Sequence, residues 1–509
     1  MNSTAAQSLR RPILLALGAA ILFAGALGLY TRQNTFPFFY HPDEPDKVDQ
    51  LITGKWNFHH PLLMLGTAET AKKALGIPDN EQSLVILGRW CSAAFAAGGV
   101  LWLALLGLRV RGPAGFWIIG LLLLTQHQVF ELAHYFKEDT ALFFAVALAF
   151  LALHIYHRRP ATFTSLFVGA TCGLCLSAKY LGAVMIVPAA VILIAAQRGH
   201  RARATQWLWF ACGFVAIAAA INFPIFRRLD VFTHSFGRET VLVAHGERGY
   251  TGGQVAILEY LHMLVINTTP VVWFLIIAEL IAVRKRADVF AWTMAISPFA
   301  FLLLLSCSTK TNDRYFLPVT GGLYYLAGLG VLDLPALLPL QWTARLKPAL
   351  VTALALLVNI FNYPAGLASY IAAFSHDDRG EMLAWIRTNI PATAVIAAEN
   401  RADLPTPDRE ERLAVQPLLP QRIIETKYAA DLAPIPSALP PKGINYIVLS
   451  ESDYGIFLRK AASSHLSTDL QRKRAFYDAL FKNYQPVWQR PRSTGVYLHP
   501  GLSIYRLTP

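Results

Sequence analysis

The sequence from residue 10 to residue 30 reads RRPILLALGAAILFAGALGLY. Two arginines are followed by an unbroken apolar run of about 19 residues, close to the ~20 that an α-helix needs to cross a bilayer core. Because basic residues favour the cytoplasmic side, this pattern predicts a span over 12–30 that enters from the cytoplasm. Ala24-Gly25-Ala26 also resembles a signal-peptide cleavage site, but the run exceeds a typical signal-peptide core, which favours a retained anchor.

The same apolar character continues through most of the chain. Of the 509 residues, 54% are hydrophobic and 15% are charged, whereas soluble domains carry about 25% charged residues. We predict a polytopic α-helical membrane protein with about eleven transmembrane helices, each near the length of a bilayer core. The spans are expected at 12–30, 84–108, 114–130, 139–156, 162–178, 181–196, 207–226, 263–283, 289–306, 315–332 and 349–373.

The charges of the predicted loops give an orientation. After the first span, every second loop is basic, as the positive-inside rule requires of cytoplasmic loops. These loops contain Arg109 with Arg111, Arg158 with Arg159, Arg198 with Arg201 and Arg203, Arg284-Lys285-Arg286, and Arg345 with Lys347. We therefore expect an integral plasma (inner) membrane protein with a cytoplasmic N-terminus. The membrane explains the net charge of +13, so no nucleic-acid partner is predicted.

Two domains follow from this pattern. Residues 1–374 form a membrane domain whose first outer loop is 31–83, and residues 375–509 form an extracytoplasmic (periplasmic) domain. The second domain mixes a helical pattern at Gly380–Thr388 with the apolar run Tyr446–Leu449, which indicates an α/β fold. We expect it to help recognise the acceptor and to lack catalytic residues, because no carboxylate-histidine cluster is visible in its sequence. The outer segment 227–253 contains four glycines between 246 and 253 and is expected to be a mobile loop.

The first outer loop carries paired carboxylates close to the membrane surface. Residues 39–46 read Phe-Tyr-His-Pro-Asp-Glu-Pro-Asp, with Asp43 and Glu44 at the centre. One carboxylate beside a low-dielectric surface can have a raised pKa and serve as a general base. The alternative is a solvated acidic turn between two prolines, which spacing alone does not exclude.

Two adjacent histidines, His59 and His60, follow in the same loop. Histidines near carboxylates can bind a divalent metal ion, but neighbouring side chains on an extended strand point apart. The pair is therefore a candidate for either metal binding or acceptor binding, and metal dependence stays open.

Ionisable residues gather where the predicted spans reach the outer surface. They are Arg89, His127, Glu131, Lys137, Asp139, Lys179, Glu259, His262 and Arg314. Such charges usually line a cavity or pair with one another. A carrier of lipid-linked substrates would instead place polar groups near the midplane, and a non-catalytic anchor for the outer domain would not need them. No nucleotide-binding glycine motif is present, so an activated substrate must arrive in the membrane.

In these residues the chain resembles the family-39-like glycosyltransferases of the GT-C superfamily, which includes the protein O-mannosyltransferases and the lipid A aminoarabinose transferase. Asp43-Glu44 is similar to that family's acidic motif after the first span, and His60-Pro61-Leu62 matches its His-Pro-Pro-Leu segment in part. Further similar segments are Leu87-Gly88-Arg89-Trp90, Lys137-Glu138-Asp139, Ser177-Ala178-Lys179-Tyr180, Asp313-Arg314-Tyr315-Phe316-Leu317-Pro318, and Asp378-Arg379 with Trp385-Ile386. The resemblance covers nearly the whole chain, and the order and shared side of these segments make it specific.

The resemblance implies an inverting glycosyltransferase that takes a sugar from a polyprenyl-phosphate donor and transfers it to a lipid, glycan or protein acceptor. It makes Asp43 the candidate base, and Lys179 and Arg314, supported by Tyr315, the candidate phosphate-binding residues. Arginine suits two-pronged phosphate contacts, and lysine serves as a point charge. Glu44, Asp139, His59 and His60 are candidates for shaping the acceptor site or holding a divalent ion. The sugar and the oligomeric state are left open.

Overall fold

A computed structural model describes most of the chain. The described residues are 3–35, 39–196, 200–245, 256–286, 288–308, 312–337, 347–362, 365–405, 418–433, 441–458, 468–493 and 497–507. The glycines of the predicted mobile loop, at 246–253, lie outside these residues.

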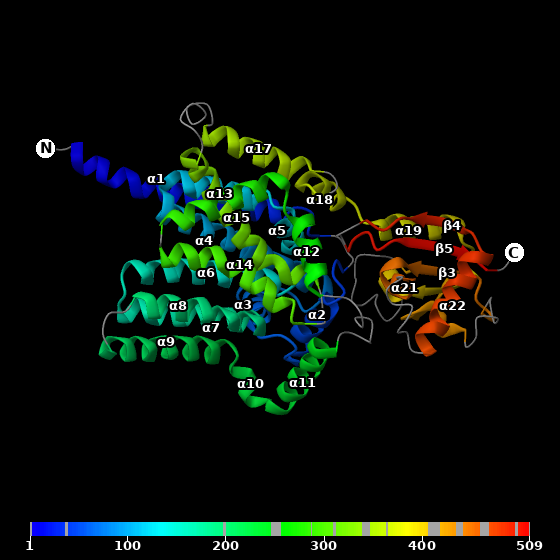
Figure 1. Ribbon diagram of the computed structural model, residues 1–509. Coiled ribbons are helices and arrows are strands. Elements are labelled where there is room, and N and C mark those ends of the chain that lie inside the picture. The colour runs from blue at the N-terminus through cyan, green and yellow to red at the C-terminus, as the bar shows by residue number, and fades with distance from the viewer. Residues whose placement is uncertain are drawn as a thin grey trace.

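The first part of the chain is a bundle of helices that run side by side (Figure 1). Its α-helices are α1 (Ser3–Tyr30), α2 (Glu44–Thr53), α3 (Leu63–Leu75), α4 (Glu81–Leu124), α5 (His127–Ala133), α6 (Asp139–Arg158), α7 (Thr162–Ala178), α8 (Ile186–Ala196), α9 (His200–Ile221), α10 (Phe223–Arg227), α11 (Leu229–His245), α12 (Ala256–Asn267), α13 (Pro270–Arg286), α14 (Val289–Leu305), α15 (Leu317–Asp333), α17 (Pro348–Phe361) and α18 (Leu367–Ala373). Short 3-10 helices occupy Tyr180–Met185, Asp313–Phe316 and Leu334–Leu337.

The helices of this bundle identify an integral membrane protein. Within the described residues, 5 helices are long and apolar enough to cross a membrane, or 6 if α12 and α13, which are bent by 105°, form one span. Other apolar helices, such as Val289–Leu305, have only 10–17 residues. Each predicted segment contains helix, but several cross a break, as 263–283 does between α12 and α13. Helix length supports five or six full spans and leaves the predicted count of eleven to be tested.

Two predicted spans, 84–108 and 114–130, lie largely within the 44-residue helix α4. Gly112 breaks its helical backbone with a φ of 69° and is followed by Pro113. Glycine adopts this left-handed conformation without steric cost, and proline cannot continue a helical hydrogen-bond ladder. The chain therefore turns between two helical arms at this point, where the sequence predicts a loop.

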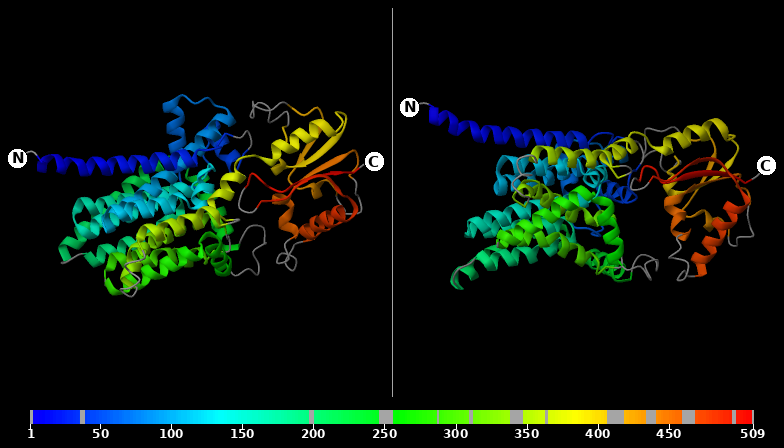
Figure 2. Two further views of the ribbon diagram at one scale, coloured as in Figure 1. Left: turned by 90° about the horizontal axis from the view of Figure 1, so that it is seen from above. Right: turned by 45° about the horizontal axis from the view of Figure 1, so that its top comes forward.

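The two ends of the bundle differ in their charged residues and in whether the outer domain lies next to them. The end farther from the outer domain contains Arg111, which pairs with Asp333, and Arg286, which pairs with Glu279 and with Asp333. The other end carries the first outer loop and faces the outer domain (Figure 2). Asp43 of this loop gathers there with Lys137 and Arg314, two of the ionisable residues predicted at the outer span ends.

The outer domain is built on one mixed sheet, which confirms the predicted combination of helices and strands. Its elements are α19 (Asp378–Asn389), β1 (Val395–Glu399), β2 (Arg422–Thr426), β3 (Tyr446–Ser450), α21 (Glu451–Leu458), α22 (Thr468–Asn483), β4 (Pro486–Arg490) and β5 (Leu502–Arg506), with short 3-10 helices at Asn400–Ala402 and Ala429–Leu432. The strand order is β2-β1-β3-β5-β4. β1 pairs in parallel with β2 and β3, whereas β5 is antiparallel to both of its neighbours.

Alternate side chains of the central strands enter two separate cores, as the twofold periodicity of a strand requires. Ile396 and Val448 pack with Ile386 of α19 on one face. Ala397 and Ile447, their sequence neighbours, pack with residues of α21 and α22 on the other. Helices therefore cover both faces of the sheet. Residues that follow its strands, such as Arg401 and Glu451, face the membrane domain.

Candidate active site

The acidic motif lies between α1 and α2, and its two carboxylates have opposite environments. The side chain of Asp43 is 43% exposed, whereas that of Glu44 is fully buried, at 0%. Pro45 occupies the first turn of α2, where its missing N–H costs no hydrogen bond. The helix thus begins within the motif and separates the two acidic side chains.

Glu44 holds the first outer loop to the bundle. Its carboxylate accepts two hydrogen bonds from Arg89 of α4, from Nε at 3.1 Å and from NH2 at 2.9 Å. It also accepts from the backbone N–H groups of Tyr40 at 2.6 Å and Phe136 at 2.9 Å. These hydrogen bonds to a buried carboxylate favour a positioning role for Glu44 over the predicted catalytic one.

The glycine before Arg89 explains the motif of residues 87–90. A Cβ on Gly88 would stand 2.2 Å from Cγ of Phe136. Only glycine therefore lets the segment between α5 and α6 approach α4 closely enough for the Phe136 N–H to reach Glu44.

Asp43 is surrounded by cationic side chains from distant parts of the chain. Lys137 pairs with Oδ2 of Asp43, and NH1 of Arg314 lies 3.3 Å from the same oxygen. Arg314 NH1 also donates a hydrogen bond of 2.6 Å to Nε2 of His41. The carboxylate therefore sits in a strongly positive environment at the end of the bundle.

This environment reverses the expectation of a raised pKa. Burial by itself raises the pKa of Asp43, but Lys137, His41 and Arg314 outweigh it and hold the pKa well below its usual range. Burial and Arg314 together lower the pKa of Lys137 to about 8. Asp43 is thus always ionised at neutral pH, and Lys137 titrates near the physiological range.

The other predicted phosphate-binding residues lie beside this cluster. The Lys179 Nζ is 3.9 Å from the centre of the Tyr315 ring, and the Arg314 guanidinium is 5.7 Å from it. Lys179 also lies 2.5 Å from Oδ1 of Asp139. The structure brings Lys179, Arg314 and Tyr315 together, with Asp139 buried behind Lys179.

The two histidines of the first outer loop lie near a second ion cluster. His60 Nε2 is 3.8 Å from Oε2 of Glu138, which also pairs with Lys47 and Lys137. Burial and Lys137 lower the pKa of His60 well below its ordinary value, so its ring is neutral. Within the described part of the chain, however, neither His59 nor His60 belongs to a group of three close metal-ligand side chains.

A polar cavity of about 680 Å³ joins these residues. This volume falls in the range of ligand-binding pockets. The membrane domain contributes Asp43, Lys47, His59, His60, Lys137, Glu138, Arg314 and Tyr315, and the outer domain contributes Arg401, Glu451, Ser452, Arg492 and Tyr497. Asp43 is therefore enclosed between the two domains.

Several cavity residues were given no individual role from the sequence, although Lys137 and Glu138 lie in a segment that carries the resemblance. Lys47, Lys137 and Glu138 are close to candidate positions, but their pairing depends on how loops and helices meet. The Tyr497 ring, from the far end of the chain, packs on His41 with centroids 4.6 Å apart. Conversely, His127 and Glu131 are buried outside the cavity, where they contact Asn267 and Tyr135.

A second cavity, of about 530 Å³, adjoins the first at His41, Pro42 and Tyr497. Its other walls come mostly from the outer domain, including Arg379, Arg401, Asp403, Tyr428 and Asp453. It therefore opens a polar path from the loops of the sheet towards Asp43.

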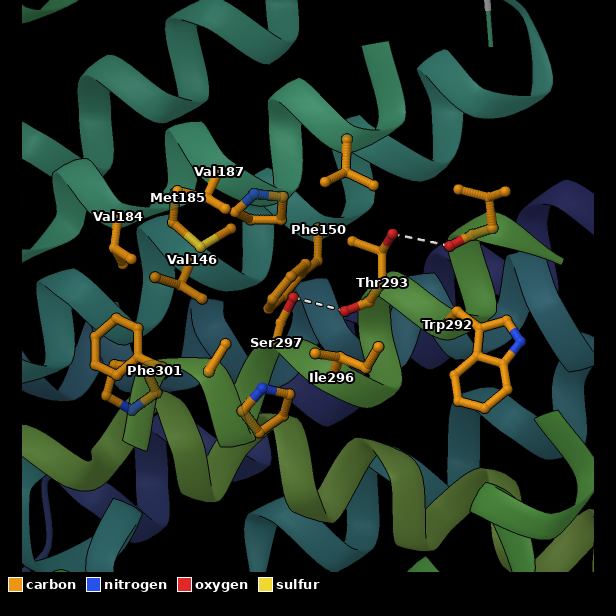
Figure 3. Close-up of a pocket in the computed structure, with 16 residues that line it drawn as sticks. Val146, Phe150, Val184, Met185, Val187, Trp292, Thr293, Ile296, Ser297 and Phe301 are labelled. Carbon is orange, nitrogen blue, oxygen red and sulfur yellow. Dashed lines mark hydrogen bonds between the residues drawn. The ribbon is translucent and has the colours of Figure 1, made fainter. Parts of the chain in front are cut away.

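An apolar groove of about 290 Å³ lies between α6, α8 and α14. Figure 3 shows its walls, with Val146, Phe150, Met185 and Phe301 around the space. Its two hydroxyls are occupied by backbone carbonyls, since Ser297 donates to Thr293 and Thr293 donates to Val289. Pro318, four residues after Arg314, lines the same groove.

Comparisons with known proteins agree with this arrangement. Residues 83–225 match the family model described as dolichyl-phosphate-mannose-protein mannosyltransferase. No curated protein matches the sequence.

Solved structures share the fold over almost the whole chain. ArnT from Cupriavidus metallidurans in the apo state is 15% identical, with a TM-score of 0.53 over 97% of this chain and 98% of that one. The same protein bound to undecaprenyl phosphate has a TM-score of 0.51 at 14% identity, with the same coverage. An oligosaccharyltransferase of Archaeoglobus fulgidus has a TM-score of 0.50 at 13% identity, covering 96% of this chain and 74% of that one.

The family match over residues 83–225 and the shared fold confirm the resemblance to the GT-C membrane glycosyltransferases that the motifs indicated.

Proposed function

We propose that the protein transfers a sugar from a polyprenyl-phosphate donor to an acceptor hydroxyl on the outer face of the membrane, with Asp43 as the general base. One observation carries this proposal: the part-exposed carboxylate of Asp43 lies in a polar cavity, in contact with Lys137 and Arg314. A carboxylate beside cations that can also hold a phosphate suits a reaction between a hydroxyl and a phosphate ester.

The donor phosphate would be held by Arg314 and Lys137, with Lys179 beyond Tyr315. In the protein alone these cations are neutralised by Asp43 and Asp139. A bound phosphate would compete for them through charge-assisted hydrogen bonds, which are among the strongest in proteins. Binding would thus weaken the hold of the cations on Asp43 and raise its basicity when the acceptor arrives.

The polyprenyl chain of the donor would lie in the apolar groove of Figure 3. From Phe301 to Val289 the groove follows 13 residues of α14, or about 18 Å at the rise of an α-helix. Its wall carries no charged side chain among its lining residues. One ArnT structure is bound to undecaprenyl phosphate, which supports a lipid of this kind.

The chemistry requires one proton acceptor and one leaving group. The acceptor oxygen attacks the anomeric carbon, the carbon–oxygen bond to phosphate breaks, and the phosphate keeps the electron pair. Asp43 takes the hydroxyl proton, while the cations stabilise the charge on the departing phosphate. A single displacement with base and leaving group on opposite sides inverts the anomeric configuration.

The acceptor would enter through the second cavity, between the first outer loop and the outer domain. Its walls offer both cationic and anionic side chains, together with the hydroxyl-bearing residues Tyr428, Ser452 and Tyr497. We propose that the outer domain selects the acceptor in this way while the membrane domain supplies the base.

The corresponding topology has eleven spans, a cytoplasmic N-terminus and domains at 1–374 and 375–509 in the plasma (inner) membrane. The separation of the Arg111–Arg286 end from the Asp43 end supports it, because cytoplasmic loops are enriched in basic residues.

Mass spectrometry of cell-envelope lipids, glycans and proteins tests the activity. Cells with the natural protein should contain a sugar-bearing species that cells without it lack, and Asp43→Asn should not restore that species. An identical envelope profile in all three strains would contradict glycosyl transfer and favour a non-catalytic anchor. Restoration by Asp43→Asn would instead favour a carrier, because transport needs no general base.

A further inference from the structure

Three potential metal ligands converge where the membrane domain joins the outer domain. His376 follows α18, Asp378 begins α19, and His499 precedes β5. One ligand atom from each lies within 4.8 Å of those from the other two. The expectation that the outer domain lacks a carboxylate-histidine cluster is wrong. The fold brings together Asp378 and His499, which are 121 positions apart.

The contacts of His499 require either a proton or a metal ion between it and Asp378. Nε2 of His499 is 2.7 Å from the carbonyl oxygen of Ala373, and a carbonyl oxygen can only accept, so Nε2 carries a hydrogen. Nδ1 of a neutral ring then has only a lone pair, yet it lies 2.7 Å from Oδ2 of Asp378. Two acceptors at this distance need a proton or a metal ion between them.

The contact with Ala373 also has the form that orients a metal-binding histidine. Such rings usually donate their second N–H to a carbonyl or carboxylate, which fixes the tautomer and aims the free nitrogen at the ion. Here Ala373 performs this role for His499, and Nδ1 points to Asp378.

His376 supplies a third ligand and an open side. Its Nε2 is 3.6 Å from Oδ1 of Asp378, near the ~3.4 Å that separates neighbouring ligands in a tetrahedral zinc site. Its side chain is 53% exposed, whereas those of Asp378 and His499 are 6% exposed. An ion could therefore enter from solvent past His376, and the fourth position would be open to water.

We propose that His376, Asp378 and His499 bind one divalent transition-metal ion of the zinc type. Two imidazoles and one carboxylate favour zinc and its neighbours, since magnesium and calcium prefer all-oxygen ligands. The ion would fasten the end of the last membrane helix to α19 and to the segment before β5. It is separate from the donor phosphate site around Asp43.

Metal binding here would also fix two segments that border the cavity containing Asp43. Tyr497, two residues before His499, packs on His41. Arg379, next to Asp378, donates a 2.7 Å hydrogen bond to the carbonyl of Phe39 in the acidic loop. The ion would therefore set the position of both chain segments that border Asp43.

The experiment uses the full-length protein purified in detergent and stripped with a chelator. Zinc is titrated in competition with a fluorescent chelator, without donor or acceptor, so the result is independent of glycosyl transfer. The natural protein should bind one zinc ion per chain. His376→Ala, which alters an exposed side chain, should weaken binding at least about tenfold, and His234→Ala, at an exposed histidine of α11, should not.

Thermal unfolding gives a second readout. Zinc should raise the melting temperature of the natural protein and of His234→Ala, but not that of Asp378→Asn. Equal zinc affinity in the natural protein and His376→Ala would overturn the site. So would the absence of stoichiometric zinc binding, because a proton alone would then satisfy His499 and Asp378.

Discussion

The guanidinium of Arg314 lies 3.3 Å from the carboxylate of Asp43, although 271 residues separate them in the chain. This contact joins the proposed base to a proposed phosphate-binding residue before any substrate is present. Because an ion pair lowers the basicity of its carboxylate, the protein alone would hold Asp43 in an inactive state. Arrival of the donor phosphate would release it.

Asp43→Asn should abolish turnover while leaving donor binding intact. The amide keeps the shape of the side chain but cannot accept the hydroxyl proton, and loss of a general base typically costs about 10²–10⁴ in rate. Single-turnover transfer with bound donor is the measurement. Asp49→Asn, at an exposed position of α2, is the matched control, and near-normal transfer by Asp43→Asn would move the base elsewhere, with Asp139 the next candidate.

Donor affinity should fall as the pH rises through about 8. The pKa of Lys137 in the protein alone is lowered to about 8, and a bound phosphodiester would raise it. The contribution of Lys137 to affinity is therefore complete below pH 8 and is lost at higher pH, by roughly tenfold or more. Equilibrium binding of a polyprenyl-phosphate sugar between pH 6 and 10 measures this loss of affinity. Lys137→Arg keeps its positive charge throughout, so its donor affinity should not fall over this range. An equal fall in both proteins would assign the pH dependence to another group.

Glu44→Gln should destabilise the protein rather than remove a catalytic group. It would leave Arg89, fully buried at 0% exposure, without its opposite charge, and breaking a buried ion pair usually costs about 3–5 kcal/mol. The free energy of unfolding, measured in detergent, gives the loss. The double variant Glu44→Gln/Arg89→Gln should lose much less than the sum of the single variants, and simple additivity would contradict the pairing.

The sequence was sufficient for features that depend on local pattern. Apolar runs located the helices, and the motif order identified Asp43, Lys179, Arg314 and Tyr315, which the structure gathers at one end. Spacing could not choose between Asp43 and Glu44, because that choice depends on burial, and burial depends on Arg89 and Phe136 reaching Glu44 from other elements.

Features that depend on long-range contact were missed. The lowered pKa of Asp43 arises from Lys137 and Arg314, whose approach no local pattern encodes. The same holds for Tyr497 and for the His376–Asp378–His499 cluster, since the C-terminal strand returns to the domain junction only in the folded chain. The helix count was affected by breaks such as the 105° bend between α12 and α13, which interrupts the predicted span 263–283.

Reporter fusions after Arg203 and after Ser375 should report opposite sides of the membrane. The N-terminal ends of α1 and α9 lie at the end of the bundle away from the outer domain, as Figure 1 shows. A fusion after Arg203 should therefore be cytoplasmic and one after Ser375 extracytoplasmic. A fusion after Arg286 serves as a second cytoplasmic reference. Finding the Arg203 and Ser375 reporters on one side would refute the proposed orientation.

Arg314→Lys should weaken donor binding although it keeps the positive charge. The NH1 group of Arg314 reaches both Asp43 and His41, and a guanidinium can present two parallel N–H groups to a phosphate, whereas an ammonium group acts as a point charge. Losing one charge-assisted hydrogen bond is worth about 1.5–3 kcal/mol, or roughly 10–100-fold in the dissociation constant for the donor. Arg228→Lys, at a 59% exposed arginine at the end of α10, controls for the general effect of the exchange. Unchanged donor affinity in Arg314→Lys would show that the phosphate is held elsewhere. A loss of acceptor affinity alone would assign Arg314 to the acceptor site.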